Sequence, residues 1–331
     1  MRVLIIKLTS MGDLMHALPA ITDAVSVMPD LEFHWVVDES FQEVPHWHQA
    51  VKKTITTAHR RWKKNILNVV KRGELKQFYQ LLNKDDYDVV IDMQGNLKSA
   101  FVSVLRRGPV HGYDKKSCRE WPAHRSYKHR YPVNLRQHST ERQRDLFAQV
   151  FNYKKPTTPI NYGVDFSNLS LPDLDLPEKY IVFVHNASWP TKLWPLEYWQ
   201  ALIAKVVAKG YSVLLPCGSD SEHARAKTIA SCDAAAIALP KMPLNSMAAI
   251  LSRADGAVCS DTGLAHMAAV AKTPAITLYA VTDTLLIGTE GENQHHIVAE
   301  GGIKNASMAD ISVETVFKKL EQILPASDES L

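Results

Sequence analysis

Polar residues and a glycine stand together in SDTGLAHMAA (260–269), where an apolar segment gives way to a helical pattern. Backbone amides at a helix start are free to bind phosphate, and Gly263 lets a ligand approach closely. Asp261 would repel a diphosphate, so we expect it to bind sugar hydroxyls. Thr262 and the Gly263 amide would face phosphate, and His266 lies one helical turn further along. An ordinary helix cap by Asp or Thr is the alternative.

A second aspartate stands in TSMGDLMHALP (9–19), another turn from a strand into a helix. This turn lacks the G-x-G-x-x-G pattern of a dinucleotide site. Gly12 lets a ligand approach the chain, and Asp13 follows the carboxyl end of the first predicted strand. A carboxylate there could take the proton from an attacking hydroxyl. A capping role for Asp13 in a helix over 13–28 is an equally good interpretation.

Lys192 follows a predicted strand in the aromatic loop HNASWPTKLWP (185–195). A lysine can neutralise the charge of a departing diphosphate without a metal, although a solvated loop lysine is the alternative. Asp173 and Asp175 spell D-x-D, but they fall in a proline-flanked stretch rather than after a strand. The sequence therefore predicts no metal site.

Two further residues could contact a nucleoside. Glu222 follows the predicted strand 211–216 and could reach a ribose hydroxyl, but with Ser219 it also spells a capping box. Met242, in the loop LPKMPL, could pack against a base or be buried in its own loop.

Positive charge is concentrated in the first half of the chain. Residues 1–155 hold 26 Lys and Arg against 16 Asp and Glu, a net charge of +10, whereas the remainder carries −7. The densest run is RRWKK (60–64), and such runs are usually solvated surfaces. The charge favours an anionic partner, and without a recognition motif bearing interleaved aromatics we do not expect nucleic acid.

The length and composition of the chain indicate its domain number, its compartment and the state of its cysteines. A chain of 331 residues is long for one domain. It has no apolar run near the roughly 18 residues of a membrane span and no signal-peptide pattern, so we expect a cytoplasmic protein. The four cysteines are scattered singly, which predicts reduced thiols.

Alternating strand and helix patterns predict an α/β protein of two doubly wound, Rossmann-like domains facing across a cleft. Predicted strands include 3–8, 33–38 and 87–95 in the first domain and 180–185, 211–216, 256–261 and 275–280 in the second. A basic helix is expected over 62–82. We predict a first domain over 1–168, a linker over 169–179, a second domain over 180–312, and a closing helix and tail over 313–331.

Several motifs together resemble one enzyme family. The chain resembles the lipopolysaccharide core heptosyltransferase I family, with its motifs in the same order over nearly the whole chain. These motifs are SMGDLMHALPA, RRWKK, DMQGNLKSA (92–100), HGYDKKSCRE (111–120), TKLWP and SDTGLAH. The resemblance implies a GT-B architecture and inverting transfer of heptose from ADP-L-glycero-β-D-manno-heptose to a Kdo sugar on lipid A. It implies a monomer at the cytoplasmic face of the inner membrane, with no metal or cofactor.

The resemblance also implies a role for individual residues. Asp13 would be the general base, and Lys192 would hold the donor phosphates. Further donor contacts would come from Ser188, Glu222, Met242, Asp261, Thr262, Gly263 and His266, and acceptor contacts from Ser10, Gly12, Arg60, Arg61, Lys64 and Arg119. The chain departs from the family at 187–188, where Ala187-Ser188 replaces a common Thr-Thr pair and leaves Ser188 as the remaining hydroxyl.

Three rival functions remain compatible with the sequence. A related heptosyltransferase with another core acceptor would share the donor motifs. A sugar-nucleotide epimerase or phosphorylase of the same architecture would use the cleft without a lipid acceptor. A nucleic-acid-binding protein could use the +10 half, and steeply salt-dependent binding would identify it.

Overall fold

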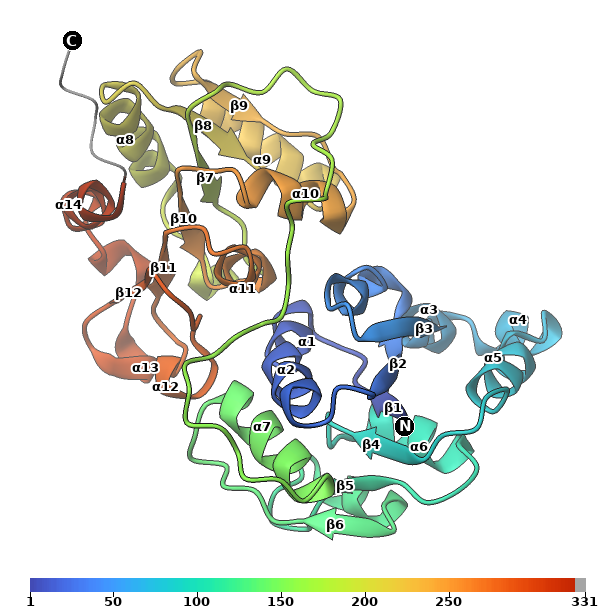
Figure 1. Ribbon diagram of the computed structural model, residues 1–331. Coiled ribbons are helices and arrows are strands. Elements are labelled where there is room, and N and C mark those ends of the chain that lie inside the picture. The colour runs from blue at the N-terminus through green and yellow to red at the C-terminus, as the bar shows by residue number, and fades with distance from the viewer. Residues whose placement is uncertain (325–331) are drawn as a thin grey trace. The chain divides into compact units, whose positions relative to one another are not determined.

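The computed structural model describes residues 1–324, and the end of the predicted tail, 325–331, lies outside the described residues. The chain divides into two compact units, which meet in sequence between Val164 and Asp165. Each unit contains one six-stranded parallel sheet and helices that follow its strands (Figure 1). The predicted pair of doubly wound α/β sheets is confirmed. None of the described helices combines the length and the apolar character that crossing a bilayer requires.

The sheet of unit 1 has the strand order β3-β2-β1-β4-β5-β6. Its strands are β1 (Arg2–Ile6), β2 (Glu32–Asp38), β3 (Val51–Thr57), β4 (Val89–Asp92), β5 (His111–Tyr113) and β6 (His129–Tyr131). Its helices are α1 (Met11–Met15), α2 (Leu18–Val27), α3 (His59–Lys64), α4 (Ile66–Lys71), α5 (Glu74–Leu82), α6 (Leu97–Leu105) and α7 (Ser139–Val150). Short 3₁₀ turns are η1 (Glu39–Phe41), η2 (Val44–Trp47) and η3 (Trp121–Ser126).

Two helices predicted to be continuous are interrupted, and the prediction was wrong at both. The helix expected over 13–28 is divided into α1 and α2, because Pro19 has no N–H to donate and takes a place in the first turn of α2. The helix expected over 62–82 is divided into α3, α4 and α5. Asn65 leaves the helical conformation and caps α4 with its side chain, and Gly73 adopts a φ of +68° before α5.

Helix α7, which the periodicity did not indicate, packs beside α2 through a buried ion pair. The Arg144 side chain is only 4% exposed and donates to Asp23 and Glu141, each at 2.6 Å. Its Nη2 also donates to the Pro156 carbonyl at 3.0 Å. A buried cation therefore fixes a helix whose sequence is mostly polar.

Replacing Arg144 with alanine should lower the free energy of unfolding of unit 1 by about 3–5 kcal/mol, because Asp23 and Glu141 would lose their shared cation. Urea denaturation followed by circular dichroism measures this loss. The exposed Arg136 offers a matched control, and its replacement should change stability by less than about 0.5 kcal/mol. Equal stability of the two variants would contradict the anchoring role.

The sheet of unit 2 has the order β12-β11-β10-β7-β8-β9. Its strands are β7 (Tyr180–Val184), β8 (Ser212–Leu215), β9 (Ala236–Ala238), β10 (Gly256–Ser260), β11 (Ala275–Tyr279) and β12 (Gln294–Val298). Its helices are α8 (Leu196–Val207), α9 (Asp220–Ala230), α10 (Leu244–Leu251), α11 (Gly263–Val270), α12 (Thr284–Ile287), α13 (Gly302–Asn305) and α14 (Val313–Ile323), with 3₁₀ turns η4 (Pro190–Lys192) and η5 (Met308–Asp310).

The core of unit 2 joins the closing helix to the sheet. Trp194 and Trp199 are fully buried and meet edge to face, with ring centroids 4.9 Å apart. Val316 and Leu320 of α14 belong to the same apolar cluster, so this helix is part of unit 2. The predicted linker, 169–179, contains no helix or strand.

Candidate active site

Each sheet has one point at which the strand order reverses. In unit 1 the reversal lies between β1 and β4, and in unit 2 it lies between β7 and β10. In open parallel sheets, ligands bind beside the carboxyl ends of the strands at such a point, because the flanking loops turn to opposite faces. Asp13 follows β1, Lys192 follows β7, and Asp261 follows β10. The sequence motifs therefore lie at the switch points of their own sheets.

Asp13 has one oxygen occupied and one available. Its Oδ2 accepts from the Ser10 backbone N–H at 3.0 Å and from the Ser10 hydroxyl at 2.8 Å, and Arg119 Nη1 lies 3.9 Å away. Within residues 1–324, no hydrogen bond is made by Oδ1. The side chain is 24% exposed. Asp13 thus makes a capping contact with the start of α1, as the alternative interpretation predicted, and still retains an oxygen for a substrate hydroxyl.

Charge around Asp13 keeps the carboxylate ionised. Burial by itself would raise its pKa, but the positive charge of Lys7 and the two hydrogen bonds from Ser10 outweigh burial and lower the pKa of Asp13 below 3.8. Lys7 is 5% exposed, and burial lowers its pKa to about 8 although Asp13 opposes the shift. Sequence analysis missed Lys7, whose signal was a lysine at the end of the buried strand VLIIK.

Gln94, also missed, holds the loop that carries Asp13. Its Oε1 accepts from the backbone N–H groups of Leu8 at 2.6 Å and Thr9 at 3.3 Å. Asp92 in turn accepts from the Gln94 backbone at 2.8 Å and from the Tyr127 hydroxyl at 2.8 Å. Because β1 and β4 are neighbours, the loop after one strand supports the loop after the other.

The cations predicted to meet the acceptor differ in their surroundings. Arg61 donates to Glu39 at 3.1 Å and to Glu74 at 2.6 Å, so an anion there would have to displace a carboxylate. Arg60 is exposed and lies 5.7 Å from the centre of the Phe41 ring. Lys64 is also exposed, and Arg119 is 66% exposed beside Asp13. The geometry favours Arg60, Lys64 and Arg119 over Arg61 as anion contacts.

In unit 2 the structure joins two of the predicted donor residues. Lys192 Nζ lies 2.5 Å from Asp261 Oδ2, although 69 residues separate them in sequence. The lysine and aspartate side chains are 20% and 9% exposed. The Thr282 hydroxyl, beyond β11, donates to the same carboxylate oxygen. Lys192 is therefore not a freely solvated lysine, and Asp261 contacts side chains rather than capping α11.

Unpartnered polar atoms surround the start of α11. Thr262 occupies the N-cap position but makes no side-chain cap bond, and its Oγ1 is buried with no hydrogen-bond partner among the described residues. Ser260 Oγ, at the end of β10, is also buried without a hydrogen-bond partner among the described residues. Buried polar atoms normally find partners, so these two hydroxyls mark a place where a polar ligand could supply them. Gly263 begins α11, and His266 is buried one turn further along.

The remaining predicted donor residues follow other strands of this sheet. Glu222, in α9 after β8, accepts from the Gly218 N–H at 2.6 Å, and its own N–H donates to Ser219 Oγ. It therefore takes part in capping α9. Met242 is half-buried in the loop after β9, and Ser188 is exposed in the loop after β7. All three lie beyond carboxyl ends of parallel strands, on the β7-β8-β9 side of the sheet.

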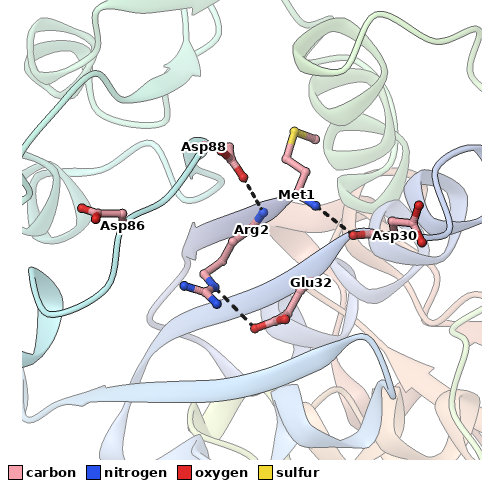
Figure 2. A pocket seen from close by; sticks show the side chains of 6 residues that line it. All are labelled: Met1, Arg2, Asp30, Glu32, Asp86 and Asp88. Atoms are coloured by element: carbon pink, nitrogen blue, oxygen red, sulfur yellow. Dashed lines mark hydrogen bonds and ion pairs between the residues drawn. The ribbon is translucent and has the colours of Figure 1, made fainter.

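A cavity of about 360 Å³ lies at the opposite, amino-terminal edge of the unit 1 sheet (Figure 2). It is lined by Met1, Arg2, Asp30, Glu32, Asp86 and Asp88. The Arg2 backbone N–H donates to Asp88 at 2.7 Å, and its guanidinium pairs with Glu32 at 3.5 Å. Four of the six lining residues are carboxylates, so negative charge dominates the lining. Such a lining repels a diphosphate, and this cavity is not the candidate site. In the part of the chain that the structure describes, no three His, Cys, Asp or Glu side chains are grouped to hold a metal.

Comparison with known proteins identifies the family of this chain. Residues 75–316 match glycosyltransferase family 9 (heptosyltransferase), which is well over half of the chain. This chain belongs to glycosyltransferase family 9.

Relatives within the family match nearly the full length. Lipopolysaccharide heptosyltransferase 1 of Pseudomonas aeruginosa is 43% identical over 298 residues, covering 90% of this chain and 83% of the relative. The structure of E. coli heptosyltransferase WaaC with ADP superposes with a TM-score of 0.91 at 39% identity, covering 98% of this chain and 100% of WaaC. WaaC with ADP-2-deoxy-2-fluoro heptose gives 0.88 at 38% identity, covering 97% and 99%. The chain is a glycosyltransferase with the GT-B fold.

Proposed function

We propose that this family 9 enzyme transfers L-glycero-D-manno-heptose, with inversion, from ADP-heptose to a Kdo sugar of lipid A. The observation that carries the donor assignment is the group at the switch point of unit 2. It combines a cation, Lys192, a carboxylate, Asp261, and unpartnered polar atoms at the start of α11. The relative WaaC has been solved with an ADP-heptose analogue, which supports the same donor here. The +10 charge of residues 1–155 supports an anionic acceptor.

The proposed donor lies along the carboxyl edge of the unit 2 sheet. Its diphosphate would contact Thr262, the Gly263 amide and Lys192, with His266 and Ser188 nearby. Asp261 would accept hydrogen bonds from heptose hydroxyls. When the donor binds, the Lys192–Asp261 ion pair would break. Lys192 would then contact phosphate and Asp261 would contact the sugar. Glu222 and Met242, beyond β8 and β9, would flank the adenosine.

The proposed reaction is a single displacement. The oxygen of a Kdo hydroxyl attacks the anomeric carbon of the heptose while the bond from that carbon to the phosphate oxygen breaks. Oδ1 of Asp13 takes the hydroxyl proton, and the bonding electrons leave with ADP. Lys192 and the α11 amides stabilise the charge that develops on ADP. The loop of Ser10 and Gly12, with Arg60, Lys64 and Arg119, would hold the acceptor, and the enzyme would work at the cytoplasmic face of the inner membrane.

ADP release tests the acceptor assignment. With ADP-heptose as donor, we expect release with Kdo-bearing lipid A and only background release with lipid A that lacks Kdo, because the proposed nucleophile is a Kdo hydroxyl. Mass spectrometry should show one heptose added to the lipid. Release without Kdo would overturn this acceptor. Isomerised ADP-heptose formed without any acceptor would instead indicate an epimerase.

A further inference from the structure

Helix α4 presents three apolar side chains to solvent. Ile66, Leu67 and Val70 are 52%, 74% and 61% exposed, and we call them the α4 ridge. Val69, which is 3% exposed, is the one buried residue of this helix. Single exposed apolar residues are common, but three together on a six-residue helix make a local apolar surface.

The breaks on either side of α4 leave it as an element of its own. Asn65 caps its start, and Gly73, with its positive φ, separates it from α5. Figure 1 shows α4 at the margin of unit 1, beyond α5. Helix α5 contacts strand β3, whereas α4 packs mainly on its neighbours α3 and α5. The ridge is thus carried outward from the sheet.

Positive charge borders the ridge on both sides. Lys63 and Lys64 precede it, Lys71 and Arg72 follow it, and all four are exposed. Residues 60–76 contain seven Lys and Arg against a single carboxylate. That carboxylate, Glu74, is already engaged by Arg61 at 2.6 Å and by the Trp62 indole N–H at 3.0 Å. The positive charge around the ridge is therefore largely uncompensated.

We propose that the α4 ridge inserts into the headgroup layer of a membrane rich in anionic phospholipid, with the flanking Lys63, Lys71 and Arg72 contacting lipid phosphates. Apolar residues bordered by basic ones have the composition of interfacial membrane-binding helices. A second copy of this chain is a poorer occupant, because a symmetric contact would bring the same positive charges together. The inference rests on the proposed function, since a lipid-anchored acceptor must be reached at a membrane. Beyond that function, the inference identifies α4 as the part of the chain that contacts the membrane.

Docking there would also place the proposed acceptor contacts. Helix α3, which carries Arg60 and Lys64, immediately precedes α4. Because α3 is in contact with α4, insertion of the ridge among the headgroups would bring Arg60 and Lys64 close to the lipid phosphates and the sugars attached to them.

Sedimentation with vesicles tests the proposal on the full-length protein. We expect binding to phosphatidylglycerol vesicles, little binding to phosphatidylcholine vesicles, and weakening with salt. The double variant Leu67→Ser/Val70→Ser should bind anionic vesicles at least about ten-fold more weakly. Leu285→Ser is the matched control, because Leu285 is 81% exposed on α12 beside Asp283, with no lysine or arginine between 273 and 303. It should bind like the wild type.

The outcomes separate this inference from the proposed function. Transfer to a water-soluble Kdo acceptor without acyl chains should be unchanged in Leu67→Ser/Val70→Ser, while transfer to vesicle-embedded acceptor falls. Vesicle binding can be measured even if no transfer is found. Wild-type-like vesicle binding by Leu67→Ser/Val70→Ser would overturn the insertion of α4. The proposal would also be overturned if the wild-type protein did not bind vesicles but self-associated, and if Leu67→Ser/Val70→Ser abolished that self-association.

Discussion

Replacing Asp13 with asparagine should lower kcat by about two to four orders of magnitude, with little change in ADP-heptose binding. The reason is that Oδ1 of Asp13 is the oxygen proposed to accept the Kdo proton, and an amide cannot accept it. The asparagine oxygen can still accept from the Ser10 N–H, so the start of α1 should remain capped. The loss should therefore be catalytic rather than structural.

Steady-state ADP release at saturating substrates measures this loss, and calorimetric titration with ADP-heptose measures donor affinity. Ser10→Ala is the matched control, because it removes one hydrogen bond to Oδ2 but leaves the carboxylate in place. Its effect on kcat should stay within about ten-fold. Near-normal turnover by Asp13→Asn would show that another group takes the proton.

The pH profile gives an independent check on the same residue. Because the pKa of Asp13 is lowered from 3.8, the carboxylate stays ionised at any pH above that value. The acid limb of kcat/KM, which reports the free enzyme, should therefore fall only below about pH 4. An acid limb near neutral pH would instead indicate a histidine or a carboxyl group with a raised pKa.

Replacing Lys192 with glutamine should lower kcat by about 10²- to 10³-fold and weaken ADP binding, because the departing diphosphate would lose its proposed cation. The same change leaves Asp261, only 9% exposed, without its ion-pair partner. Unit 2 should therefore lose up to about 3 kcal/mol of stability as well. The two effects need separate measurements.

The double variant Lys192→Gln/Asp261→Asn separates them. Two neutral side chains can hydrogen-bond, so stability should largely return, whereas kcat should remain low. Lys205→Gln serves as a control for the loss of an ion pair in the same unit, because Lys205 pairs with Glu314 at 3.0 Å on the surface. It should leave kcat unchanged. Recovery of turnover in the double variant would show that Lys192 acts only by neutralising Asp261.

Local sequence was enough to place the central strands and the main motifs. The apolar runs that became β1, β4, β7 and β10 are buried on both faces of a parallel sheet, and such strands read as continuous apolar segments. It was not enough for β3, an edge strand that contains Lys52 and Lys53, or for α7, which is anchored by the buried Arg144. In those elements the burial depends on partners that are distant in sequence.

The candidate site divides in the same way. The sequence by itself determined that Asp13 and Asp261 follow strands and that a glycine stands at the start of the helix beside each of them, because these features depend on neighbours within one helical turn. Whether Asp261 caps a helix or meets a cation was decided by strand order, which brings Lys192 and Thr282 to the same carboxylate. Lys7 and Gln94 support Asp13 and its loop, and both were likewise positioned by the pairing of β1 with β4. Strand pairing brings together residues that are far apart in the chain, and local periodicity does not predict which strands will be neighbours.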